Sequence, residues 1–134
     1  MRVLFVAGFG PIVQDMETSR RLYGDALGIP FEGDETYLHT SAVDGVKHFA
    51  LWPLSAAAES CFGTPNWPDD LPIPHAWLEF DVEDIDVATR ELEAKGYRLL
   101  VARHTEPWEQ IVTRFLSPEG LLVAVSVTPS LRDS

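Results

Sequence analysis

Residues 74–96, PHAWLEFDVEDIDVATRELEAKG, contain the pattern that decides the fold. The first part alternates in character, which predicts a strand over residues 75–82. Asp84 then offers a carboxylate as a helix N-cap, and apolar residues recur at three- and four-residue spacing. Gly96 follows, and its freedom to adopt positive φ suits the end of a helix. The stretch therefore predicts a strand followed by an amphipathic helix.

A second, weaker copy of this pattern lies near the N-terminus. Residues 3–9 predict a strand, Asp15 a helix N-cap and Gly28 the helix end. The two caps are 69 residues apart (84 − 15) and the two glycines 68 (96 − 28), and such an offset indicates an internal repeat. The first helix is expected to bury an apolar stripe formed by Met16, Leu22, Tyr23 and Leu27.

Each predicted helix is followed by three short predicted strands, which gives each copy the order βαβββ. The expected strands cover residues 29–32, 37–41 and 46–52 in the first copy, and residues 97–102, 109–116 and 121–127 in the second. Four prolines in residues 64–74 interrupt the rhythm. We therefore expect a single domain over residues 1–134, with module 1 at about 1–54, a linker at 55–74 and module 2 at about 75–129.

The composition excludes several classes of protein. The net charge of −11 argues against nucleic acid binding, because phosphates require Lys and Arg. It permits a cationic small ligand, although solubility explains it more simply. Residues 1–10 lack the regions of a signal peptide, and no apolar run approaches the roughly 20 residues of a membrane span. Cys61 is the single cysteine, which suits a reducing compartment. We expect a cytoplasmic protein that binds neither nucleic acid nor membrane.

Three segments resemble the vicinal-oxygen-chelate superfamily, which includes glyoxalase I, extradiol dioxygenases, fosfomycin-resistance enzymes and bleomycin-resistance proteins. They are QDMETSRRLYGDALGIPFE (14–32), DVEDIDVATRELEAKGY (81–97) and RFLSPEGLLVAV (114–125), with Ser117 where the family's turn usually has Asp. The resemblance implies an α+β fold of two βαβββ modules whose curved, mixed sheets enclose a ligand groove. It also implies a homodimer, with or without exchange of strands between the subunits.

Enzymes of this superfamily hold a divalent metal ion on inward positions of the first and fourth strand of each module. By position, these ligands would fall on Gly8, Ala50, Trp77 and Ala124, none of which has a side chain that can bind the ion. The resemblance therefore points to the metal-free, antibiotic-binding branch, typified by bleomycin-resistance proteins. We expect no metal, no cofactor and no catalytic residue.

Strand alternation places further side chains in the expected groove. His75 and Glu79 share the face of Trp77, and His48 and Trp52 share one face of the opposite strand. Planar aromatic side chains could stack on a conjugated ligand, although each tryptophan could equally fill the core. The residues expected to bind the ligand are Trp77, Trp52, His75, Glu79, Gly8, Ala124, His48, Trp67, Trp108 and Phe9.

The sequence thus predicts a metal-independent binding protein that confers antibiotic resistance by sequestering a DNA-damaging natural product. Bleomycin-type compounds and aromatic enediynes or anthraquinones are equal candidates for the ligand. Two alternatives stay open. One is a lyase, isomerase or cyclase that acts on a natural-product intermediate with His75 or Glu79 as general base. The other is a glyoxalase-like metalloenzyme with displaced ligands.

Overall fold

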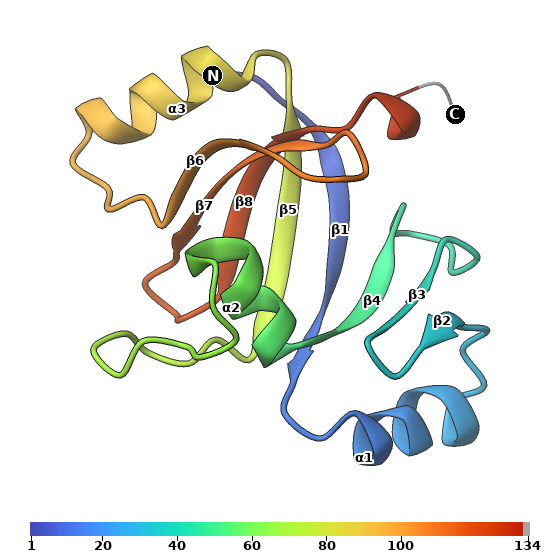
Figure 1. The fold of residues 1–134 in the computed structure, drawn as a ribbon. Helices are drawn as coiled ribbons and strands as arrows, with labels where there is room; N and C mark the ends of the chain where they lie inside the picture. The colour runs from blue at the N-terminus through green and yellow to red at the C-terminus, as the bar shows by residue number, and fades with distance from the viewer. Residues whose placement is uncertain (133–134) are drawn as a thin grey trace.

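Eight strands form an open, curved sheet in the computed structural model, which describes residues 1–132 (Figure 1). The strands lie in the order β2-β3-β4-β1-β5-β8-β7-β6. Their bounds are β1 (Val3–Val13), β2 (Glu32–Asp34), β3 (Tyr37–Thr40), β4 (Phe49–Pro53), β5 (Ala76–Val82), β6 (Val101–Thr105), β7 (Ile111–Leu116) and β8 (Leu122–Val127). The helical segments are α1 (Met16–Arg20) with its π-helical continuation η1 (Arg21–Ala26), α2 (Leu54–Phe62), α3 (Ile85–Ala94) and the short η2 (Pro129–Leu131).

The first strands of the two modules, β1 and β5, form the centre of the sheet. They pair antiparallel, whereas β1 with β4 and β5 with β8 pair in parallel. In the central pair Gly8 lies opposite Glu79 and Gly10 opposite Trp77. Adding the 69-residue offset to Gly8 gives Trp77, and adding it to Gly10 gives Glu79. The central register therefore relates the two copies by an approximate two-fold axis.

Both predicted helix starts are present. The Asp15 carboxylate accepts a hydrogen bond from the backbone N–H of Thr18 at 3.2 Å. The Asp84 carboxylate accepts from the backbone N–H groups of Asp86 at 2.9 Å and Val87 at 3.1 Å. These bonds satisfy N–H groups that have no partner within the helix, so the same cap fixes where each module turns from strand to helix.

The expected apolar stripe of the first helix is only half correct. Met16 and Tyr23 pack against the cluster of Val13, Leu38 and Leu51. Leu22 and Leu27, however, are 52% and 61% exposed. The helix widens to a π-helix at Arg21, and the N–H of Leu27 bonds the carbonyl of Leu22, five residues back. This wider turn rotates the later side chains away from the face that a regular α-helix would bury.

Three predicted strands begin three or four residues too early. β2 starts at Glu32 instead of residue 29, because Pro30 has no backbone N–H to offer a sheet. β4 starts at Phe49 instead of residue 46, and β6 at Val101 instead of residue 97. The N–H of Tyr97 still bonds the carbonyl of Leu92, so hydrogen bonds to α3 extend beyond its last residue and residue 97 is not free to join the sheet.

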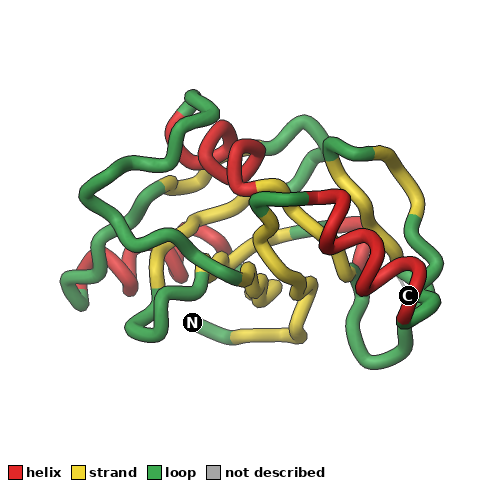
Figure 2. The backbone as a smooth tube through the Cα atoms, turned by 90° about the horizontal axis from the view of Figure 1, so that it is seen from below, coloured by secondary structure: helices red, strands yellow, loops and turns green. Residues whose placement is uncertain are grey.

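The predicted linker contains a structural element. Residues 54–62 form α2, which buries Ala57, Ala58 and Cys61. Two of them join a core cluster with Trp77 of β5, so α2 lies on the sheet face that carries Trp77, here called the concave face. Helix α3 packs against Val82 and Val125 of the opposite, convex face. Figure 2 shows the helices around the periphery and the strands in the middle.

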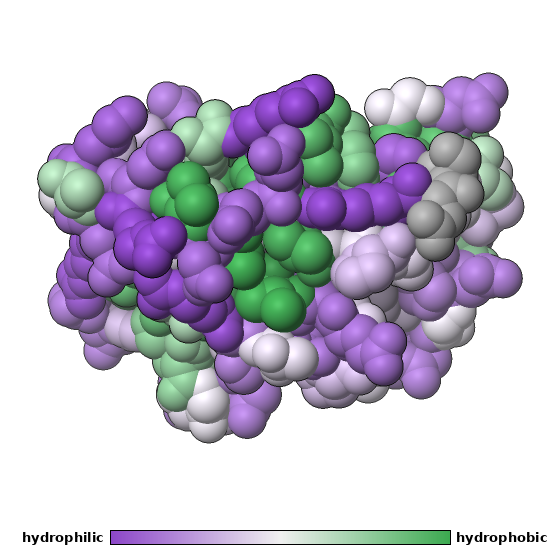
Figure 3. All heavy atoms as spheres, turned by 90° about the horizontal axis from the view of Figure 1, so that it is seen from above, coloured by the Kyte–Doolittle hydropathy of each residue, from purple (hydrophilic) through white to green (hydrophobic). Residues whose placement is uncertain are grey.

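The surface is mostly polar, with apolar patches between charged groups. Figure 3 shows such patches on the face seen from above. Strand β1 leaves Val3, Leu4, Val6 and Phe9 exposed. Within residues 1–132, the helices are too short or too polar to span a bilayer.

Gly10 allows a test of how closely β1 must approach the backbone of β4. A Cβ atom at this position would lie 2.0 Å from the carbonyl oxygen of Ala50 on β4. We expect Gly10→Ala to lower the free energy of unfolding by about 2–3 kcal/mol, because backbone must move to admit the methyl group. Chemical denaturation measures the change.

Gly24→Ala is the matched control, since its Cβ would meet nothing closer than 3.6 Å, at Phe31. Alanine favours helix over glycine by up to about 1 kcal/mol, so this variant should be unchanged or more stable. Equal destabilisation of the two variants would contradict the close approach.

Candidate functional site

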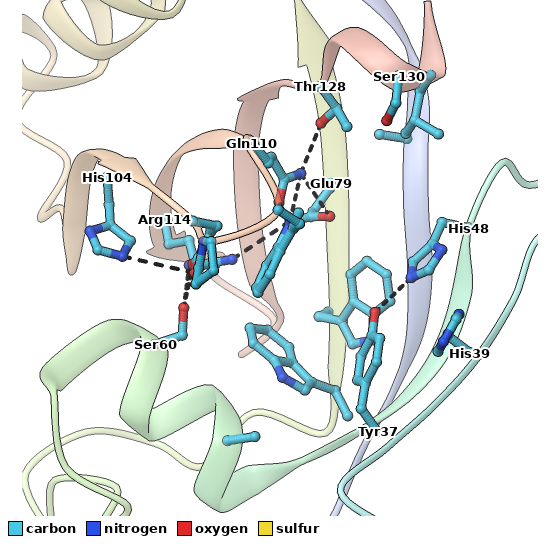
Figure 4. A pocket seen from close by; sticks show the side chains of 18 of the residues that line it. Tyr37, His39, His48, Ser60, Glu79, His104, Gln110, Arg114, Thr128 and Ser130 are labelled. Carbon is cyan, nitrogen blue, oxygen red and sulfur yellow. Dashed lines mark hydrogen bonds and ion pairs between the residues drawn. The ribbon is translucent and has the colours of Figure 1, made fainter. Parts of the chain in front are cut away.

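A cavity of about 800 Å³ opens on the concave face of the sheet. Both modules, helix α2 and the segment after β8 contribute side chains to its lining. Figure 4 shows imidazole and phenol groups of module 1 on one side and charged groups of module 2 on the other. The volume lies within the range of roughly 300–1,000 Å³ that is usual for small-molecule sites.

Trp52 and Trp77 form the aromatic floor of the cavity. Their rings meet edge to face, with centroids 6.2 Å apart and an interplanar angle of 79°. Trp77 is 4% exposed, and its indole N–H donates a hydrogen bond to the carbonyl of Ala50 at 3.2 Å. This bond and the missing side chains of Gly8 and Gly10 fix the ring against β1. The floor is therefore pre-formed and rigid.

A phenol and two imidazoles form the module 1 wall. The Tyr37 hydroxyl lies 2.6 Å from Nε2 of His48. The rings of Tyr37, His39 and His48 stack on one another with centroids 5.2–6.0 Å apart. Burial raises the pKa of Tyr37, and burial together with His39 lowers the pKa of His48. Tyr37 and His48 are therefore neutral at neutral pH, and this pair offers polar but uncharged contacts.

Arg114 organises the opposite wall. It is 2% exposed and projects from β7. Its Nη1 lies 2.7 Å from the Glu106 carboxylate and 2.7 Å from Oγ of Ser60, and this hydroxyl donates to the same carboxylate at 2.5 Å. The guanidinium also lies over the ring of Trp52, 5.2 Å from its centroid. Arg114 thus ties module 2, helix α2 and the aromatic floor together.

Glu79 occupies the middle of the cavity wall. Both of its oxygens lie 3.5 Å from Nε2 of Gln110, and Oε1 lies 3.8 Å from Arg114. The Gln110 amide also donates to Thr128 at 2.9 Å and accepts from the indole N–H of Trp108 at 2.9 Å. Burial raises the pKa of Glu79 despite the attraction of Arg114.

Small residues allow these charged groups to share one row across the sheet. Gly8, Glu79, Ala124 and Arg114 are consecutive partners on β1, β5, β8 and β7. Because Ala124 carries only a methyl group, Arg114 can pass over it toward Glu79. A larger side chain at position 124 would separate the guanidinium from this carboxylate.

The metal site of the superfamily enzymes has no donors here. Gly8, Ala50 and Ala124 lack ligating side chains, and the indole of Trp77 donates its N–H to a carbonyl. A Cβ at position 8 would come within 2.6 Å of the Trp77 ring, so this ring fills the space that a ligating side chain on β1 would need. Across residues 1–132, no three His, Cys, Asp or Glu side chains converge as a metal site requires. The residues present do not fit the metal.

Half of the residues expected to bind the ligand line the cavity. These are Trp77, Trp52, Glu79, His48 and Trp108. Gly8 and Ala124 lie beneath it, where they give room to Trp77 and Arg114.

Three expected residues lie elsewhere. His75 is exposed, because β5 begins at Ala76 and His75 stands before the strand. Phe9 points to the convex face and is 42% exposed, since its neighbours Gly8 and Gly10 face Trp77. Trp67 packs on Phe62, and its N–H bonds the carbonyl of Pro72.

Several lining residues were not predicted. Arg114 was part of the segment that resembles the superfamily, and an arginine within an otherwise apolar strand was a signal of a buried ion pair. Other polar or aromatic lining residues that were not predicted include Tyr37, His39, Glu59, Ser60, His104, Glu106, Gln110 and Thr128. Ser60 could not have been found, because the position of α2 over the sheet is a tertiary feature.

Cys61, on the same helix, is buried, and this raises the pKa of its thiol to about 11.

Comparisons with known proteins agree with this architecture. The Glyoxalase/Bleomycin resistance protein/Dioxygenase superfamily model matches residues 9–125, so the chain belongs to this superfamily. None of the curated proteins searched matches it.

Several solved structures share the fold. A superfamily member from Vibrio splendidus 12B01 has a TM-score of 0.60 and 15% identity, over 93% of this chain and 99% of that chain. Methylmalonyl-CoA epimerase from Mycobacterium tuberculosis has a TM-score of 0.58 and 20% identity, over 98% and 93%. A structure described as an NAD-dependent benzaldehyde dehydrogenase from Legionella pneumophila has a TM-score of 0.59 and 14% identity, over 90% and 96%. At these identities the likeness concerns the fold alone.

Arg114 allows a test of the ionic wall. Arg114→Met should lower the free energy of unfolding by about 3–5 kcal/mol, because it leaves two buried carboxylates without their cation. Adding Glu106→Gln should recover part of this loss, since one of the two charges disappears. Urea denaturation of the two single variants and the double variant gives the coupling energy. Additive losses would show that Arg114 and Glu106 do not act as a pair.

Proposed function

We propose that this protein binds a planar aromatic small molecule without a metal ion, and that it confers resistance by sequestering a DNA-damaging natural product. The observation that carries the proposal is the aromatic lining of the cavity at the place where related enzymes hold a metal. Trp77 occupies one of the metal-ligand positions, and Trp52 and Trp108 extend the aromatic surface.

The geometry suits a flat, conjugated ligand. Trp52 and Trp77 are held by their mutual contact and by the bond to Ala50, so packing a ligand against this floor costs little side-chain entropy. Trp108 is 57% exposed at the edge of the cavity, where it can cover a bound molecule from the solvent side. Each aromatic pair contributes about 0.5–1.5 kcal/mol beyond the burial of apolar area. Anthraquinone and enediyne chromophores and the planar part of bleomycin are ligands of this kind.

An acid–base enzyme is the second candidate, and Glu79 is the observation that favours it. Its carboxylate faces the cavity and has a raised pKa, which suits a group that removes or returns a proton. His75, the other base considered, is exposed before β5 and has no place in such a reaction. Long incubation of the protein with a bound compound separates the two functions. Sequestration returns the compound unchanged, whereas an enzyme returns an altered product.

The homodimer and the cytoplasmic location expected from the sequence stay predictions. Light scattering after size-exclusion chromatography measures the mass in solution directly.

Trp108 provides the test of stacking. Trp108→Ala should weaken the binding of an anthraquinone drug about 2- to 12-fold, the range that corresponds to one lost aromatic pair. Since the side chain is largely exposed, the fold should be unaffected. Quenching of the remaining tryptophans during a fluorescence titration reports the affinity.

Trp67→Phe is the control, because Trp67 packs on Phe62 outside the cavity. This variant should bind like the wild type. Unchanged affinity in Trp108→Ala, or equal weakening in both variants, would count against an aromatic binding site at this place.

A further inference from the structure

Three carboxylates are buried on the concave side of module 2, and two of them have close cationic partners. Asp81 is 0% exposed and lies 2.7 Å from Nε of Arg132, and it also accepts from the N–H of Thr128 at 3.0 Å. Glu106 is 4% exposed and lies 2.7 Å from Arg114. The burial of each of these charges is therefore offset by an ion pair with short contacts.

Glu79 differs from both. Its side chain is 12% exposed, yet within residues 1–132 its closest polar contacts are the two at 3.5 Å to the Gln110 amide. Such distances lie at the limit of a hydrogen bond. Arg114 lies 3.8 Å from Glu79 but only 2.7 Å from Glu106, so its closer ion pair is with Glu106. Arg114 can balance only one of these two carboxylates, so when both are ionised the pair retains a net charge of −1.

We propose that Glu79 is the binding site for a cationic nitrogen of the ligand, so that the occupant is a planar aromatic compound with a protonated amine or ring nitrogen. This inference rests on the proposed function of the cavity and names the class of ligand within it. The cation would take the place on Glu79 that Arg114 leaves open.

The surroundings of Glu79 favour a cation over an anion or a neutral group. Trp108 lines the same cavity and is 57% exposed, and indole faces attract positive charge. The carboxylate of Glu59 on α2 also faces the cavity, and the chain as a whole carries a net charge of −11. Such a field draws cations toward the opening.

Protonation of Glu79 couples binding to pH. Burial raises the pKa of Glu79, and it outweighs the opposing effects of Arg114 and Gln110; Glu106 and Asp81 act in the same direction as burial. A cation prefers the ionised carboxylate, so its affinity should rise as the pH rises through the pKa of Glu79. By linkage, binding of the cation lowers this pKa and releases a proton.

Three tricyclic probes of similar shape test the inference: 9-aminoacridine is cationic, 9-anthracenemethanol is neutral and anthracene-9-carboxylate is anionic at neutral pH. The wild-type protein should bind the cation at least about tenfold more tightly than the neutral probe. Glu79→Gln should remove this preference and leave the neutral probe unaffected. Fluorescence titration measures all affinities, and thermal melting verifies that the variant is folded.

Glu59→Gln is the matched control, because it removes the same charge from an exposed position on α2 at the cavity. It should keep most of the preference for the cation. Equal loss in the two variants would assign the preference to the general field and overturn the role of Glu79.

The outcomes also separate this inference from the proposed function. Binding of the neutral and cationic probes with equal affinity would overturn the cation site and leave the aromatic cavity standing. Binding of none of the probes would overturn both. If Glu79→Gln does not fold, calorimetry of the wild type in two buffers of different ionisation enthalpy decides. Proton release with 9-aminoacridine that grows as the pH falls through the pKa of Glu79 supports the site, and its absence at every pH measured overturns it.

Discussion

The structure depends on the close contact between the indole of Trp77 and the backbone of β1. Side chains are missing at Gly8 and Gly10, and a Cβ at either position would collide with the Trp77 ring or with β4. The indole N–H crosses β1 to bond Ala50 on β4, so one side chain links the two central strands with a third. The same contact sets the floor of the cavity and removes the space for a metal ligand on β1. Fold and site therefore follow from one packing constraint.

A second constraint is the burial of charge. Arg114 is surrounded by Trp52, Ser60, Glu106 and Glu79, and it holds helix α2 against module 2 through Ser60. Buried ion pairs contribute little net stability, because desolvation cancels much of their attraction. Removing one partner is costly, however, because it leaves a buried charge without its counterion. The pair therefore favours the packing in which both partners meet, even where it adds little net stability. The ionic wall thus fixes the shape of the cavity and leaves Glu79 less well compensated than Glu106 and Asp81.

The sequence predicted the parts of this architecture that depend on local chemistry. Asp15 and Asp84 cap the two helices, and the repeat offset that they define reappears in the register of β1 and β5. The features that it did not predict depend on tertiary structure. A π-helical turn exposed Leu22 and Leu27, and the linker supplied α2 to the cavity wall. Strand alternation placed Trp77 and Glu79 on the face of β5 that lines the cavity, but it could not show that His75 stands before the strand.

The asymmetry of the cavity follows from the duplication. The repeat offset makes Gly8 equivalent to Trp77 and Gly10 equivalent to Glu79, and the register places each glycine opposite the other module's large side chain. An approximate two-fold axis would otherwise bring equal side chains together at the centre, where two indoles or two carboxylates would clash or repel. Because module 1 has glycine at positions 8 and 10, the side chains of Trp77 and Glu79 from module 2 can occupy the space over the centre of the sheet. Module 2 can therefore place an aromatic ring and an acid side by side on one strand, and module 1 contributes the neutral wall of Tyr37 and His48 opposite them. A symmetric pair of modules could not present a stacking surface and a single charge to the same ligand.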